Sequence, residues 1–110
     1  MKLALTVCEN RISPLFDCAR MLLIVDIVDR TSTGRHFEVL HYESPFSRAA
    51  KLSDLGVKVL ICGAVSDQFA NIIETYGIKI VPFVAGAVDD VIDAYLTGGL
   101  YNAKFRMPGC

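Results

Sequence analysis

The second half of the chain alternates between helical and strand-like hydrophobic patterns, and this alternation limits the fold more than any other feature of the sequence. A nearly continuous apolar run covers residues 57–62 (VKVLIC), as expected of a central strand that is buried on both faces. Residues 78–84 (IKIVPFV) form a second run, in which Pro82 removes one backbone donor and so places the strand at the edge of the sheet. Strands that alternate with helices favour parallel pairing through right-handed crossovers.

Three helices are expected around these two strands. The first two begin at serines that suit N-caps, and the third has two consecutive aspartates in its first turn, where they complement the helix dipole. Each pattern stops at a glycine, the residue that most often ends a helix. The expected limits are Ser44 to Gly56, Ser66 to Gly77 and Val88 to Gly98.

The first half of the chain predicts three further strands, at residues 2–7, 21–28 and 35–43, with a loop between the first two. Residues 29–34 (DRTSTG) supply turn residues that join the last two strands as a hairpin. The order βββαβαβα therefore predicts an α/β domain, a mixed five-stranded sheet flanked by helices, in which the first, fourth and fifth strands run parallel. We expect this domain to cover residues 1–99 and to be followed by a C-terminal tail, residues 100–110.

Composition and charge exclude several classes of partner. Hydrophobic residues make up 53% of the chain and charged residues 21%, which excludes a disordered chain. The net charge of -1, from 11 basic and 12 acidic residues, leaves no basic stripe for nucleic acid. The apolar runs are shorter than the ~20 residues of a membrane span, and no export signal is evident after Met1. We expect a cytoplasmic protein that binds neither nucleic acid nor a membrane.

Cysteines converge on one edge of the predicted sheet. The first strand ends at Cys8, the fourth ends at Cys62, and the loop after the first strand carries Cys18. Soft thiolate ligands suit zinc, copper(I) or iron-sulfur species. Gly63 and Gly86, which follow two parallel strands, would let backbone amides approach an anionic ligand closely.

Each cysteine also has an interpretation that involves no ligand. Cys8 and Cys62 end apolar strands and fit the role of small buried side chains equally well. Cys18 differs, because it lies in a loop among charged residues and therefore suits a ligand or a reactive thiol. Cys110 is the final residue, and we interpret it either as a mobile ligand or as a truncation scar. No pair has the two-residue spacing of zinc ribbons or ferredoxins, so spacing alone does not establish a metal site.

Several stretches together resemble the dinitrogenase iron-molybdenum cofactor biosynthesis family, which includes NifX, NafY and the carboxyl-terminal region of NifB. They are residues 10–20 (NRISPLFDCAR), 60–64 (LICGA) and 105–110 (FRMPGC). The resemblance implies a ribonuclease H-like sheet and a role in binding or carrying iron-sulfur cofactor precursors. The sequence departs from the family at Leu15, where histidine is frequent, and at Asp17, where glycine is frequent. These departures favour Cys18 as the local donor.

Three functional hypotheses follow. The first is a non-enzymatic carrier or scaffold for an iron-sulfur cluster or iron-molybdenum cofactor precursor, with Cys18, Cys62 and Cys110 as metal ligands and Cys8 and Gly63 completing the site. The second is an interaction or regulatory module with structural cysteines, whose partner is a cluster-assembly ATPase or a radical enzyme. The third, a two-metal nuclease, is disfavoured because cysteines stand where the strand ends would need carboxylates. A monomer and a homodimer are both compatible with the sequence.

Overall fold

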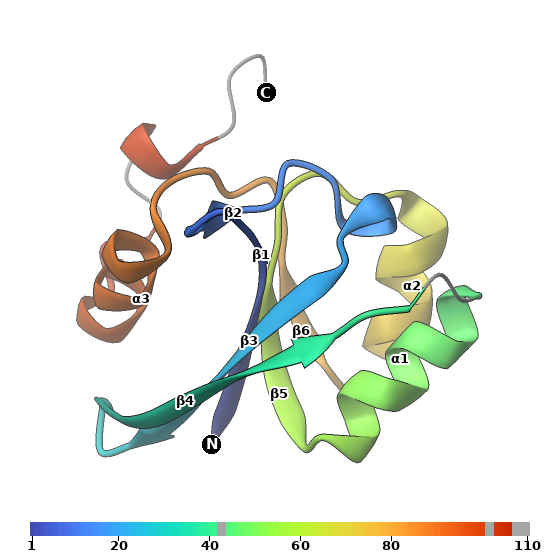
Figure 1. The fold of residues 1–110 in the computed structure, drawn as a ribbon, viewed down its shortest axis with the longest axis horizontal. Coiled ribbons are helices and arrows are strands. Elements are labelled where there is room, and N and C mark those ends of the chain that lie inside the picture. Colours follow the sequence, from blue (N-terminus) through green and yellow to red (C-terminus); the bar gives the residue numbers. More distant parts are fainter. Residues whose placement is uncertain (42–43, 101–102, 107–110) are drawn as a thin grey trace.

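The computed structural model describes residues 1–41, 44–100 and 103–106, which form one mixed sheet with helices on both faces (Figure 1). The strands are β1 (Lys2–Cys8), β2 (Arg11–Ile12), β3 (Met21–Val28), β4 (Thr31–Val39), β5 (Val57–Ile61) and β6 (Lys79–Val81). The helices are α1 (Pro45–Asp54), α2 (Asp67–Thr75) and α3 (Val88–Thr97), with short 3-10 turns η1 (Phe16–Cys18) and η2 (Ala103–Phe105).

The strand order confirms the predicted mixed α/β sheet. It runs β4-β3-β1-β5-β6, and β2 pairs with β1 outside this path. β1 and β5 are parallel, as are β5 and β6, whereas β1, β3 and β4 pair antiparallel. β6 lies at the parallel edge, as Pro82 predicted. This is the ribonuclease H-like arrangement that the family resemblance implied.

The hairpin between β3 and β4 differs from the prediction. Its turn contains two residues, Asp29 and Arg30, both with left-handed φ angles (50° and 61°), and β4 begins at Thr31 rather than at Arg35. A two-residue turn of this kind matches the twist of the strands that it joins. The polar residues 31–34 therefore extend the hairpin instead of forming a loop, with a register shift next to Asp26.

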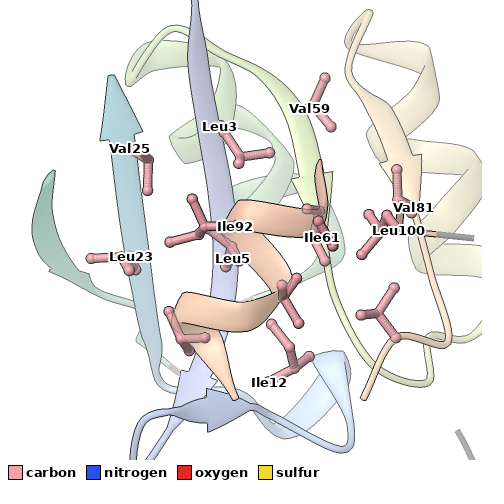
Figure 2. Close-up of a cluster of buried hydrophobic side chains, with 14 of the residues drawn as sticks. Leu3, Leu5, Ile12, Leu23, Val25, Val59, Ile61, Val81, Ile92 and Leu100 are labelled. Atoms are coloured by element: carbon pink, nitrogen blue, oxygen red, sulfur yellow. The ribbon is translucent and has the colours of Figure 1, made fainter. Parts of the chain in front are cut away.

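Two hydrophobic layers enclose the sheet, and they are unequal. α1 and α2 cover one face, whereas α3 packs on the other, where Ile92 lies over Leu3, Leu5 and Leu23 (Figure 2). Leu100 and Phe105, from the segment expected to be a tail, are buried in the α3 layer. None of the helices in the described ranges is long and apolar enough to cross a membrane.

One helix does not cover the whole width of its face: α3 reaches β4 at Arg35, whose Nη1 lies 2.8 Å from Asp89 Oδ1, but it leaves much of this outer strand exposed. Phe37 pairs with Leu23 across β3 and β4, so the two side chains share the α3 face. Leu23 is buried, but Phe37 is 59% exposed and Val39 is 47% exposed. The unequal layers therefore leave an apolar strip of β4 open to solvent.

The loop between β2 and β3 is attached directly to the end of β5. Phe16 donates its backbone N–H to the Ala64 carbonyl (2.8 Å), and Ala64 donates to the Pro14 carbonyl (2.9 Å). A Cβ atom on Gly63 would lie 2.6 Å from the Pro14 carbonyl oxygen and closer still to that of Ser13. Only glycine allows the two backbones to approach in this way.

We expect Gly63→Ala to lower the free energy of unfolding by about 3 kcal/mol, because the new methyl group meets backbone atoms that cannot rotate away. Urea unfolding followed by circular dichroism measures the change. Gly34→Ala is the matched control, since its added Cβ would meet its nearest atom at an ordinary 3.7 Å. Equal losses in the two variants would contradict the interpretation.

Candidate functional site

A surface cavity of about 450 Å³ opens where β1 ends and β3 begins. Cys8, at the end of β1, and Cys18, at the end of η1, both line it and both are exposed. Glu9, Arg20 and Phe37 also contribute to its wall. We call this site the thiol cavity. Its volume lies within the ~300–1,000 Å³ typical of small-ligand sites.

The turn after Cys8 fixes one side of the thiol cavity. Glu9 and Asn10 have left-handed φ angles of 50° and 65°, and the chain reverses so that Cys8 pairs with Arg11. The Asn10 carbonyl accepts a hydrogen bond from the backbone N–H of Val88 at the start of α3 (2.9 Å). Cys8 is therefore carried by a strand end that is tied to a helix.

The 3-10 turn η1 separates an inward aromatic ring from an outward thiol. The Phe16 ring is fully buried and packs edge-to-face against Phe69 of α2, with ring centroids 5.3 Å apart. Two residues later, Cys18 donates its backbone N–H to the Leu15 carbonyl (3.3 Å) and exposes its side chain. Burial of Phe16 thus determines where the Cys18 thiol lies.

Arg48 of α1 holds this turn from inside the protein. Its side chain is 2% exposed, and Nη1 donates to the Phe16 carbonyl at 2.9 Å while Nη2 donates to the His41 carbonyl at 3.4 Å. The guanidinium carbon lies 5.7 Å from the centroid of the Phe16 ring. A buried cation is costly unless hydrogen bonds replace its water. Here two carbonyls replace water, one from η1 and the other from the segment between β4 and α1.

Cys62 lies in the core and not in the thiol cavity. Its side chain is 0% exposed in the layer beneath α1 and α2. Burial, helped by the negative charge of Asp17, raises the pKa of its thiol to about 12. Metal ligands are thiolates, so this environment opposes ligation. Within the described ranges, no group of three or more His, Cys, Asp or Glu side chains is placed to hold a metal ion.

The other two predicted site residues are placed differently. Gly63 faces the backbone of Ser13 and Pro14, so the close approach that it permits is to the protein's own loop. Cys110 lies outside the described residues. The structure therefore brings together Cys8 and Cys18, but places Cys62 and Gly63 in the packing that supports them.

Two residues of this region were not anticipated from the sequence. Phe37 alternates with His36 and Glu38 along β4, a pattern that marks an apolar face but does not say whether a helix covers that face. Arg48 occupies the same helical face as Ala49 and Leu52, and an arginine on an apolar face was the available signal.

The sheet order and the thiol cavity define a ribonuclease H-like α/β domain with a cysteine-lined surface site. Residues 1–98 match the model of the family described as dinitrogenase iron-molybdenum cofactor. The chain belongs to this family, as the resemblance of its sequence motifs implied. No curated protein matches it significantly.

Solved structures share the fold. The crystal structure of PH0822 has a TM-score of 0.85 at 23% identity and covers 94% of this chain and 98% of its own. The apo form of the orange protein from Desulfovibrio gigas has a TM-score of 0.75 at 20% identity, with 96% and 94% covered. MJ0327 from Methanocaldococcus jannaschii has a TM-score of 0.73 at 24% identity, with 91% of each chain covered. At these identities the similarity establishes the fold alone.

The contrast between the thiols predicts their reactivity. With iodoacetamide at pH 8, we expect Cys62 of the folded protein to be alkylated at least ~100-fold more slowly than Cys8 and Cys18, because it is buried and its raised pKa keeps it protonated. Peptide mass spectrometry over a time course measures each site. In denaturant the three rates should converge. Rapid labelling of Cys62 in the folded protein would refute its placement.

Arg48→Ala should lower the free energy of unfolding by about 3 kcal/mol, because it leaves a cavity and removes a charged donor from the buried Phe16 carbonyl. Glu74→Ala is the control, since Glu74 is exposed on α2, and its effect should stay within about 0.5 kcal/mol. Thermal and urea unfolding measure both. Similar stabilities for the two variants would show that Arg48 does not support the turn.

Proposed function

We propose that this protein is a non-enzymatic carrier or scaffold that holds an iron-sulfur cluster or iron-molybdenum cofactor precursor in the thiol cavity. The observation that carries the proposal is the presence of two exposed thiols, Cys8 and Cys18, on the wall of one cavity. Membership of the dinitrogenase iron-molybdenum cofactor family supports the choice of cargo.

The chemistry of the cavity wall suits such a cargo. Thiolates are soft ligands that favour iron in sulfur-rich clusters. Clusters bound by thiolates are commonly anionic, and the positive charge of Arg20, which lines the same cavity, would offset that charge. Phe37 adds an apolar surface that limits the access of water to one side of the cavity.

Carriage suits the cavity better than catalysis does. Cys8, Glu9, Cys18 and Arg20 are all exposed. Catalytic groups work best in sites that exclude water, where electrostatic interactions are strong. An open site on a stable sheet edge instead lets a bound cluster be loaded and released without unfolding. We therefore infer transfer of cargo to cluster-assembly proteins rather than its chemical conversion.

The alternative function is an interaction or regulatory module in which the cysteines only pack. The burial of Cys62 fits that alternative, but the exposure of Cys8 and Cys18 does not, since an exposed thiol contributes little to packing. The two functions differ in one measurable property, which is whether the reduced protein binds a cluster.

Anaerobic reconstitution with ferrous iron and sulfide tests the proposal. The wild-type protein should bind iron and sulfide and acquire charge-transfer absorption, whereas Cys8→Ser combined with Cys18→Ser should lower the bound iron at least ~tenfold, since ligand thiolates are lost. Cys110→Ser should also lower it, because two thiols do not complete the coordination of a cluster. Iron and sulfide analysis and absorption spectra provide the measurements.

Cys62→Ala is the matched control, because it removes a buried thiol without changing the cavity wall. It should retain the cluster, and circular dichroism should show that every variant is folded. A wild-type protein that binds no cluster would refute the proposal. If the double variant retained the cluster and Cys62→Ala lost it, Cys8 and Cys18 would not be the ligands.

A further inference from the structure

β4 forms an outer edge of the sheet, and its backbone groups alternate between β3 and solvent. The Leu40 N–H donates to the Arg20 carbonyl (2.7 Å), so the backbone groups of Leu40 point toward the strand that contains Arg20's neighbour Met21, and those of every second residue before it do the same. Counting back from Leu40 through the antiparallel register, the backbone N–H and C=O groups of Arg35, Phe37 and Val39 point away from β3. They form a row of donors and acceptors on the open edge.

This edge carries only part of the protection that edge strands usually have, namely the charged Arg35 and Glu38 and the register shift next to Asp26. β4 (TSTGRHFEV) contains neither lysine nor proline, which are the common guards of an edge. The Lys51 ammonium donates to the Val39 carbonyl, but a carbonyl oxygen can accept a second hydrogen bond. Phe37 and Val39 add exposed apolar area to the same segment. An open backbone row beside exposed apolar side chains is a template for pairing with another strand.

We propose that β4 pairs antiparallel with β4 of a second copy of this chain, about a twofold axis at Phe37. In this register each Phe37 faces the Phe37 of the partner subunit, and Arg35 lies opposite the partner's Val39. The outward backbone groups of the two edges then meet in the pattern of an antiparallel ladder. Two facing phenylalanines form a stabilising cross-strand pair.

The positions of His36 and Glu38 favour this register over its neighbours. With the axis at Phe37, His36 lies opposite the partner's Glu38, and Glu38 lies opposite the partner's His36. These two side chains already approach each other within one copy, with Nε2 and Oε2 3.2 Å apart. Moving the axis by one residue would place either two His36 or two Glu38 side chains opposite each other, and facing glutamates are unfavourable. The partner that best fits this edge is thus an identical edge.

The pairing would also affect the thiol cavity. Phe37 lies on the cavity wall, so the two cavities of a dimer would flank the central pair of phenylalanine rings on one face of a continuous sheet. The partner's Phe37 would cover the exposed ring beside each cavity. This association depends on the edge of β4 and not on what the cavity binds, so its test is separate from cluster reconstitution.

Sedimentation velocity of the full chain over a concentration series, in reducing buffer, tests the proposal. We expect a reversible dimer whose dissociation constant rises at least ~tenfold in Phe37→Asp, since an aromatic residue at the centre of the interface is replaced by facing charges. Phe46→Asp is the matched control, because Phe46 is 61% exposed on α1, and it should leave the dimer intact. A wild-type monomer up to about 1 mM, or equal weakening by both variants, would overturn the proposal.

Cross-linking tests the register independently of the aspartate variants. In a background carrying Cys8→Ser, Cys18→Ser and Cys110→Ser, Phe37→Cys should form disulfide-linked dimers under mild oxidation by oxidised glutathione, because the two Cα atoms would be ~5.5 Å apart. Phe46→Cys should not. A mixture of His36→Cys and Glu38→Cys chains should cross-link to each other, and neither should link to itself. Efficient self-linking of His36→Cys, or no link at Phe37→Cys, would refute this register.

Discussion

The close contact between the first loop and the end of β5 is the constraint on which the candidate site depends. The backbone of Ser13 and Pro14 occupies the space that a side chain at position 63 would fill, and backbone hydrogen bonds on both sides of Ala64 hold the two segments together. Because the loop is fixed at β5, η1 begins at a defined point, and Cys18 is brought to the cavity that Cys8 also lines. A glycine without chemistry of its own therefore determines where the reactive groups lie.

Arg48 supplies the second support of the same loop, and it shows how a polar group can stabilise a core. Desolvation of a guanidinium opposes folding, and the two carbonyl bonds and the Phe16 ring offset part of that cost. An apolar residue there would avoid the desolvation but leave the Phe16 carbonyl without this donor. Arginine therefore contributes mainly by orienting the turn, because its planar guanidinium sets the direction in which the carbonyl of η1 points.

The sequence predicted the sheet well and the site only in part. Hydrophobic periodicity and helix caps are local signals, so the mixed sheet, its parallel strands and the edge position of β6 could be inferred. The hairpin turn was misplaced because Thr31, Ser32 and Thr33 are polar yet readily join a strand once β3 is beside them. Topology alone placed three sulfurs near one edge, but burial depends on which layer covers a strand end. The contacts of Arg48 span 32 residues to Phe16, and no local pattern encodes them.

Cys18 and Cys62 show how strongly the covering layer controls the chemistry of one residue type. By alternation along β5, Ile61 faces α3 and the next residue faces α1 and α2, where helices bury it and raise its pKa to about 12. Cys18 lies two residues after the buried Phe16, at the end of η1. No described residue covers this end of the turn, so Cys18 is exposed. The same imbalance leaves Phe37 uncovered on the face with a single helix. The open edge therefore arises because the three helices do not cover both faces of this sheet completely.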